Sequence, residues 1–279
     1  MQLWYSLVDL LLPFGWMQHE FMKNALLGVL LVTPIFGLLG TMIVNNKMAF
    51  FSDSLGHSAL TGIAIGVILG IKNPIWSILF FSVLITIAIL IVKEANTAST
   101  DTVIGVFSST AVALGIVILS RNGGFNKYSG YLIGDLLSIS PSDLLTLGIV
   151  FVIVISLWAV IFNKLLISSM NQSLARSRGI GVKFYEYLFT IMMAVIVTIS
   201  IQLVGILIIS SLLIIPAASS RNIARNMRQY HFYSVLIALI SGLAGLILSY
   251  FWGTATGATI VLITSGFFAL TFVMKLRLG

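Results

Sequence analysis

The stretch LLTLGIVFVIVISLWAVIFN, residues 144–163, decides the fold of this chain. It contains no charged side chain, and a helix of about 20 residues is just long enough to cross the hydrocarbon core of a bilayer. It is not an isolated apolar helix in a soluble protein, because 59% of the 279 residues are hydrophobic and only 8% are charged. The sequence therefore predicts an integral membrane protein.

Similar charge-free runs lie on both sides of this stretch. Three of them are single spans in length, at residues 24–46, 73–92 and 102–120, and a further helix is expected over roughly residues 49–71. Two longer runs, residues 187–220 and 232–274, would overshoot the bilayer as straight helices, so each is expected to fold back as a hairpin. Gln202 and Gly205 mark the expected break in the first of these runs.

These runs predict an all-α, polytopic helical bundle of about nine transmembrane spans. Residues 23–279 then form one transmembrane domain, and residues 1–22 form an amphipathic segment at the membrane interface. The alternative that would change the count is a re-entrant piece around residues 131–139.

The basic residues indicate which loops face the cytoplasm, because cytoplasmic loops of membrane proteins collect Lys and Arg. With about nine spans and a cytoplasmic C-terminus, most of the 15 basic residues fall on that side. The net charge of +7 thus reports membrane topology and gives no reason to expect a nucleic-acid partner. The chain has no cysteine, so any metal ligands must be histidine, carboxylate or backbone groups.

Several enzyme motifs are absent from the sequence. It contains no Gly-x-x-x-x-Gly-Lys-Ser/Thr phosphate loop, no His-Glu-x-x-His and no Gly-x-Ser-x-Gly elbow. We therefore expect that the chain is not itself an enzyme and that it holds no permanent cofactor.

Asp53 and His57 are an ionisable pair inside an expected membrane span, where charged groups are costly. They lie four residues apart where a basic loop leads into an apolar helix, and this spacing places both side chains on one helix face. At 1.5 Å per residue from Lys47, His57 lies roughly 15 Å into the membrane, where transporters bind their substrates. Gly62, Gly66 and Gly70 follow on one stripe, which favours close packing against a neighbouring helix.

A carboxylate beside a neutral imidazole suits Zn²⁺ well and Mn²⁺ acceptably. We therefore predict that Asp53 and His57 contact a transported divalent metal. The alternative is that Asp53 caps the start of its helix and His57 forms one buried hydrogen bond. Two ligands are too few for a closed zinc site, but in a two-fold dimer with these helices at the axis, two aspartates and two histidines would meet.

Three segments together resemble the ABC-transporter permeases for zinc and manganese. They are KMAFFSDSLGHSALTG at residues 47–62, LIGDLLSISPSDL at residues 132–144, and VGILIISSLLIIPAASSR at residues 204–221. The resemblance extends over roughly residues 21–275. Its Gly-Asp-Leu-Leu and Leu-Leu-Ile-Ile-Pro segments are more similar to the zinc branch of the family.

The resemblance implies a homodimeric permease in the inner membrane of a prokaryote, surrounded by lipid. It implies a transport subunit, with ATP hydrolysis in a separate partner chain. The implied partners are this cytoplasmic ATP-binding subunit and an extracytoplasmic metal-binding protein. It also implies that Asp53 and His57 are the metal-handling positions. The implied cargo is Zn²⁺ or Mn²⁺.

Residues 168–183 form the longest polar cytoplasmic stretch and are expected to contain a short helix, begun by Ser173 and ended by Gly179 or Gly181. The resemblance makes this stretch the coupling segment that contacts the ATPase. The expected coupling residues are Ser173, Leu174, Ala175, Arg176, Arg178, Gly179 and Ile180.

Two other functions are compatible with the same residues. One is an ATP-independent secondary carrier or channel for divalent cations, which would use the Asp53–His57 pair in the same way. The other is a membrane scaffold without cargo, in which Asp53 serves only as a helix cap.

Overall fold

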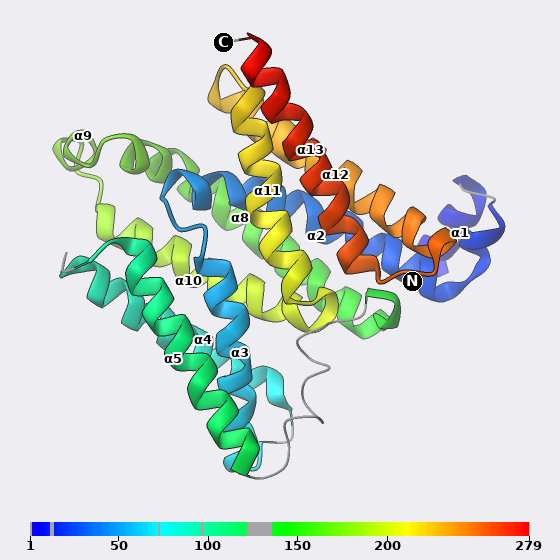
Figure 1. Ribbon diagram of the computed structural model, residues 1–279, viewed down its shortest axis with the longest axis horizontal. Coiled ribbons are helices and arrows are strands. Elements are labelled where there is room, and N and C mark those ends of the chain that lie inside the picture. The colour runs from blue at the N-terminus through cyan, green and yellow to red at the C-terminus, as the bar shows by residue number, and fades with distance from the viewer. Residues whose placement is uncertain (1, 12–13, 72, 96–97, 122–135, 279) are drawn as a thin grey trace. The chain divides into compact units, whose positions relative to one another are not determined.

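The computed structural model describes residues 2–11, 14–71, 73–95, 98–121 and 136–278 (Figure 1). Every regular element in these ranges is a helix, which confirms the predicted all-α class. The longer helices are α1 (Gln2–Leu11), α2 (Glu20–Asn45), α3 (Phe51–Ile68), α4 (Pro74–Glu94), α5 (Thr100–Arg121), α8 (Pro141–Met170), α10 (Val182–Val204), α11 (Ile206–Ile223), α12 (Met227–Trp252) and α13 (Thr256–Leu278). The short helices are η1 (Gly15–Gln18), η2 (Leu136–Ser138) and α9 (Gln172–Ser177).

The predicted spans coincide with helices α2 to α5, α8 and α10 to α13. Within the described residues, seven of these helices are long and apolar enough to cross a membrane: α2, α4, α5, α8, α10, α12 and α13. Helix α3 is outside this set because of its polar side chains, and the apolar part of α11, Ile208–Ile223, is shorter. The count of nine spans and the homodimer thus stay predictions. Most of the re-entrant piece considered for residues 131–139 lies outside the described residues.

The two long apolar runs divide where glycines interrupt them. Gly205, with φ of 88°, separates α10 from α11, as predicted from the sequence. Gly253, with φ of 61°, ends α12 and allows the chain to return along it as α13. A positive φ is unfavourable for a residue that has a Cβ atom, whereas glycine adopts it without this steric cost. These two glycines therefore set the helix ends inside runs whose hydropathy alone shows no boundary.

The chain divides into two compact units. The first comprises Met1–Thr41, Asp135–Ile153 and Leu203–Gly279. Its helices α11, α12 and α13 pack against one another, and glycines bring their backbones close together. A Cβ added to Gly245 of α12 would lie 2.8 Å from the Ile260 Cα of α13, so no larger residue fits there without a shift. The second long run is thus a helical hairpin, as predicted.

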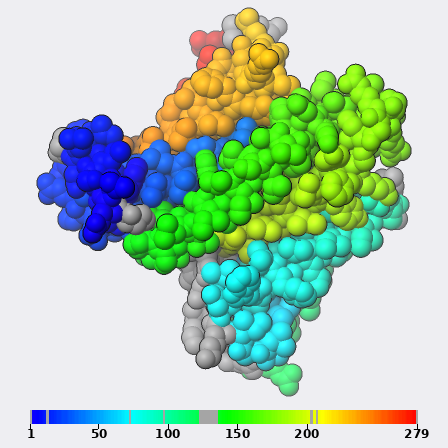
Figure 2. All heavy atoms as spheres, turned by 180° about the vertical axis from the view of Figure 1, so that it is seen from behind, coloured from blue at the N-terminus to red at the C-terminus, as the bar shows by residue number. Residues whose placement is uncertain are grey.

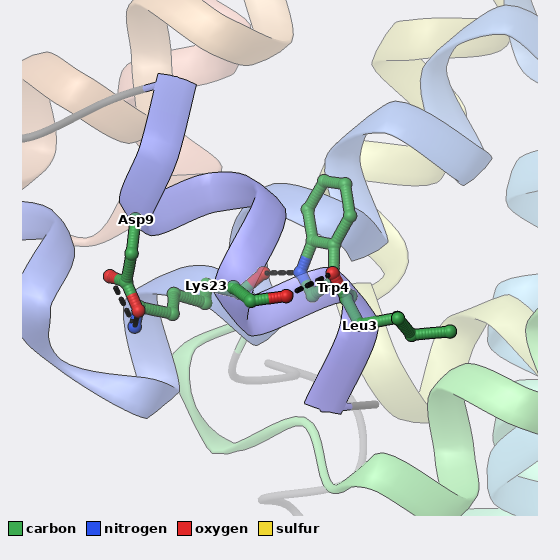
Figure 3. A network of polar contacts seen from close by, with 5 residues as sticks. Leu3, Trp4, Asp9 and Lys23 are labelled. Atoms are coloured by element: carbon green, nitrogen blue, oxygen red, sulfur yellow. Dashed lines mark hydrogen bonds and ion pairs between the residues drawn. The ribbon is translucent and has the colours of Figure 1, made fainter.

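Helix α1 rests on the start of α2 within the first unit (Figure 3). Lys23 Nζ lies 2.6 Å from an Asp9 carboxylate oxygen, and the Trp4 indole donates to the Lys23 carbonyl at 3.0 Å. The leucines Leu3, Leu7, Leu10 and Leu11 are exposed. The polar contacts therefore hold α1 in place while an apolar face is left uncovered. The interfacial position expected for residues 1–22 stays a prediction, and α2 already begins at Glu20.

The second unit comprises Met42–Gly134 and Val154–Gln202. At its centre α3 packs between α4 and α5. A Cβ on Gly62 would lie 2.6 Å from the Ile78 Cα, and one on Gly66 would lie 2.3 Å from the Ser77 hydroxyl. The predicted glycine stripe therefore does bring α3 against α4. Gly70 is different, because it has φ of 67°, lies beyond the helix and ends it.

The face of α4 away from α3 is apolar and exposed. Trp76, Phe80, Leu84, Ile87 and Ile91 recur at three- and four-residue spacing, and α4 forms part of the surface in Figure 2 (cyan). Such a stripe of large side chains is stable against lipid and not against water. Helix α4 thus has a packed side toward α3 and an apolar outer side.

Candidate metal-transfer site and coupling segment

Helix α3 begins without help from Asp53. Its N-cap residue is Phe50, which makes no side-chain capping bond, and Asp53 is the third residue inside the first turn. The preceding loop is closed by backbone bonds, since Met48 N–H donates to the Ile43 carbonyl at 3.0 Å. The cap interpretation of Asp53 is therefore wrong for this structure, and its carboxylate is available for another contact.

That contact is His57, as the four-residue spacing predicts. The Asp53 carboxylate oxygen lies 3.3 Å from His57 Nε2, and the two side chains are 45% and 42% exposed. One turn of helix brings the pair together without any tertiary contact. Both groups are half open, so an ion could approach the oxygen and nitrogen donors from the uncovered side.

The open side of the pair faces a cavity of about 560 Å³ between α3 and α5. The lining from α5 is mostly small or apolar, and its only hydroxyls are those of Ser108 and Ser109. The rest of α3 is packed: Ser54, Ser58 and Thr61 are buried, and the Thr61 hydroxyl, one turn beyond His57, donates to the Ala111 carbonyl of α5. Asp53 and His57 are thus turned toward the hollow and away from the packed interior.

The donor set of this site is incomplete for a resident metal. Among the described residues, no group of three or more His, Cys, Asp and Glu side chains lies close enough to hold one ion. A structural zinc site would have four protein ligands. One carboxylate and one imidazole bind a divalent cation only weakly. Weak binding is what a transport site needs, because it must release its ion.

A second histidine contact, at His231, was missed by the sequence reasoning. Its Nδ1 lies 2.7 Å from the Thr41 hydroxyl, across α2 and α12 of the first unit. Its neighbour Tyr230 is buried and donates to the Thr41 carbonyl at 3.4 Å. No carboxylate takes part in these bonds, so they connect two helices and do not form a metal site.

The expected coupling segment contains the short helix α9, but Ser173 does not cap it. The Asn171 side chain accepts from the Leu174 N–H at 3.0 Å and thereby occupies the cap position, which leaves Ser173 inside the first turn. Asparagine is as good a cap as serine, and here it lies two residues earlier. The predicted stop is confirmed, because Gly179 follows the helix with φ of 71°.

The end of α9 is a Schellman motif. Ile180 N–H donates to the Ala175 carbonyl at 3.0 Å, and Gly179 N–H donates to the Arg176 carbonyl at 3.0 Å. Ala175 is buried, whereas Ser173, Leu174, Arg176, Arg178 and Gly179 are exposed. The segment therefore presents most of its predicted coupling residues on a surface, and one small residue anchors it.

Directly after α9, the start of α10 is tied to the end of α4. Lys93 pairs with Glu186, and Lys183 Nζ lies 2.7 Å from a Glu94 carboxylate oxygen. We call Lys93, Glu94, Lys183 and Glu186 the charge cluster. The sequence reasoning missed it, since its members lie about 90 positions apart and no local pattern indicates the pairing.

Comparisons with known proteins identify the family of this chain. Residues 18–275 match the model of the ABC 3 transport family. The chain is 35% identical to the high-affinity zinc uptake system membrane protein ZnuB of Haemophilus influenzae, over 93% of this chain and 99% of that protein. It is 28% identical to the manganese transport system membrane protein MntC of Listeria monocytogenes, over 95% and 94% of the two chains.

A solved structure, PsaBC from Streptococcus pneumoniae in complex with Fab, is similar over nearly the whole fold. It has a TM-score of 0.78 and 28% sequence identity, and the match covers 98% of this chain and 95% of that chain. Membrane subunits of this class are transport components, and a separate subunit hydrolyses ATP. The chain therefore belongs to the ABC 3 transport family and is a multi-span inner-membrane permease of a bacterial ABC importer.

Proposed function

We propose that this permease imports a divalent transition metal and that Asp53 and His57 contact the ion during passage. The observation that carries the proposal is the Asp53–His57 pair, 3.3 Å apart and open to a cavity on an otherwise packed polar helix. Ionisable groups at membrane depth are costly and usually line a substrate pathway. The relatives named for zinc and manganese uptake support the same conclusion.

Zinc is the favoured cargo. A borderline-soft imidazole nitrogen beside a carboxylate matches Zn²⁺ better than Mn²⁺, which prefers oxygen donors. The higher identity to the zinc-uptake relative, 35% against 28% for the manganese relative, points the same way.

The proposed mechanism is alternating access across about nine spans. The ion arrives from an extracytoplasmic binding protein, exchanges water for the Asp53 and His57 donors, and leaves inward when a cytoplasmic ATPase changes state. In a homodimer, two such pairs would supply two carboxylates and two imidazoles. Lipid surrounds the assembly.

We further propose that α9 and its end form the surface that contacts the ATPase. Exposed Arg176 and Arg178 supply positive charge there, and the exposed Leu174 supplies an apolar contact. A helix capped at both ends is a rigid element. A displacement of α9 by the ATPase is therefore transmitted to the segments joined to α9 and does not unfold the helix.

Reconstitution tests this function against an ATP-independent carrier or channel. The permease is placed in proteoliposomes with and without its ATPase subunit, and entry of radioactive zinc is followed with and without ATP. We expect sustained uptake only with both the ATPase and ATP. Zinc entry down its gradient in vesicles that lack the ATPase would overturn the proposal in favour of the carrier.

Competition identifies the cargo in the same vesicles. Unlabelled Zn²⁺ is expected to suppress labelled uptake at lower concentration than Mn²⁺ does. The reverse order would assign the permease to manganese and leave the rest of the mechanism in place.

A further inference from the structure

The charge cluster joins two helices at the level of the coupling segment. Lys93 and Glu94 are adjacent on α4, and Lys183 and Glu186 are three residues apart on α10. Each helix thus contributes one positive and one negative charge, and the two ion pairs run in opposite senses. One pair alone would allow α10 to pivot about it, whereas two pairs fix the end of α10 against α4.

The same turn of α10 makes further contacts. The Lys164 ammonium of α8 donates to the Tyr185 hydroxyl at 2.7 Å and lies 5.0 Å from the centre of its ring. Lys93 and Glu186 are only 24% and 29% exposed, so this pair is partly shielded from solvent. The start of α10 is therefore held on two sides by neighbouring helices of its own unit.

The charge cluster is also next to α9. Gln172 and Arg176 of α9 line a cleft of about 190 Å³ together with all four members of the cluster. The connection from α9 to α10 is short, because α9 ends at Ser177 and α10 begins at Val182. A displacement of α9 thus acts on the very turn of α10 that the cluster binds.

From the cluster, a packed path leads to the metal pair. Helix α4 carries Lys93 and Glu94 at one end, and its Ser77 and Ile78 lie against Gly66 and Gly62 of α3. The Gly62 contact is with the Ile78 backbone, and the Gly66 contact is with the short Ser77 side chain. Because so little lies between the two helices, a movement of α4 requires α3 to follow. Helix α3 carries Asp53 and His57.

We propose that Lys93, Glu94, Lys183 and Glu186 are positioning residues that transmit movement of α9 through α4 to the metal-binding helix α3. The inference rests on the proposed function, because it assumes that the ATPase acts on α9. The cluster does not touch the ion. Its role is to transmit the ATP-driven movement of α9 to the helix that carries Asp53 and His57.

The test is a charge-exchange cycle in the reconstituted complex with its ATPase. Glu186→Lys places two lysines opposite each other, and Lys93→Glu in the same chain restores an attractive pair of reversed sense. Partly exposed ion pairs add little to folding stability, so the complex should still assemble. We measure zinc transported per ATP hydrolysed.

For Glu186→Lys we expect ATP hydrolysis to continue while zinc transported per ATP falls by about 3- to 30-fold, the usual range of coupling changes. Adding Lys93→Glu should recover most of this ratio. Asp9→Asn is the matched control: it removes a carboxylate from a pair 2.6 Å long at the other unit's N-terminal helix and should leave the ratio unchanged.

Three results would overturn the inference. The ratio could be unchanged in Glu186→Lys, hydrolysis and uptake could fall in parallel, or the complex could be lost without rescue by Lys93→Glu. The last result would make the pair a folding contact. A wild-type complex that shows no ATP-dependent zinc uptake would instead refute the proposed function itself.

Discussion

The two groups of charges in the second unit differ in how they are built. Asp53 and His57 lie on one helix and face a cavity of about 560 Å³, and their contact of 3.3 Å needs no partner helix. The charge cluster joins two helices, and Lys183 lies 2.7 Å from Glu94. A pair within one helix can exchange its partner for an ion without moving the fold. Pairs between helices link the positions of those helices, which suits transmission.

Removing either donor of the metal pair is expected to have the largest effect. Asp53→Ala and His57→Ala each leave one donor, and zinc uptake should fall by about 100-fold or more, since even indirect partners of metal ligands matter by 10–100-fold. Ser58→Ala is the control, because that buried hydroxyl donates to the Leu55 carbonyl of its own helix. The measurement is uptake by complexes of equal ATPase content. Wild-type uptake in either variant would mean that Asp53 and His57 do not contact the ion.

The next largest effect is expected from separating α3, which carries the metal pair, from α4, which carries half of the charge cluster. Gly62→Ala adds a Cβ that would lie 2.6 Å from the Ile78 Cα, so α3 and α4 must separate. Overpacking of this kind costs about 1–3 kcal/mol of folding free energy. We expect a lower melting temperature together with less zinc transported per ATP.

Gly148→Ala in α8 is the matched control, since a Cβ there meets nothing within 4 Å. An alanine in an open helix position should raise stability by up to about 1 kcal/mol. If Gly62→Ala behaved like Gly148→Ala in a thermal melt, the close α3–α4 contact would not exist in the native protein.

A smaller effect is expected where α3 meets α5. Thr61→Val keeps the shape of the side chain but loses the hydrogen bond to the Ala111 carbonyl. Interhelical hydrogen bonds in membrane proteins contribute about 0.6 kcal/mol on average. Thr86→Val is the control, because its hydroxyl donates to the Ser82 carbonyl within α4. A thermal melt should show the larger loss for Thr61→Val, and equal losses would exclude a special α3–α5 contact.

Local features of this molecule could be predicted from the sequence. Charge-free runs located the apolar helices, glycine located the breaks at Gly205 and Gly179, and helical spacing placed Asp53 against His57. Each of these depends on residues within a few positions of one another, where backbone geometry alone fixes the outcome.

Non-local features could not be predicted in this way. The Thr41–His231 contact joins residues 190 positions apart, and Lys93 and Glu186 lie 93 positions apart. Their pairing depends on how whole helices pack against one another, and no local pattern in a single sequence indicates this packing. The cap of α9 was also wrongly assigned, because Asn171 and Ser173 are equally good caps and the choice between them depends on where the preceding helix stops.

The smallest expected effect on transport concerns the joint that leads into α3. Lys47 has φ of 54°, the left-handed conformation that the glycines Gly70 and Gly179 adopt at the ends of α3 and α9. This conformation costs a residue with a Cβ about 1 kcal/mol or more. Lys47→Gly should therefore raise the stability of the folded protein by up to about 1 kcal/mol in a thermal melt, whereas Gly179→Ala should lower it by a similar amount.

A transport measurement on Lys47→Gly then tests whether the charge cluster reaches the metal pair only through α4. Lys47 shares a cleft of about 280 Å³ with Lys93 and Glu186, so its charge lies near the charge cluster without pairing to a described acidic side chain within salt-bridge distance. If the cluster acts only through α4, zinc transported per ATP should be unchanged by Lys47→Gly. A fall in this ratio with unchanged ATP hydrolysis would mean that movement also reaches α3 through the α2–α3 joint, and the cluster would then act on the metal helix from both of its ends.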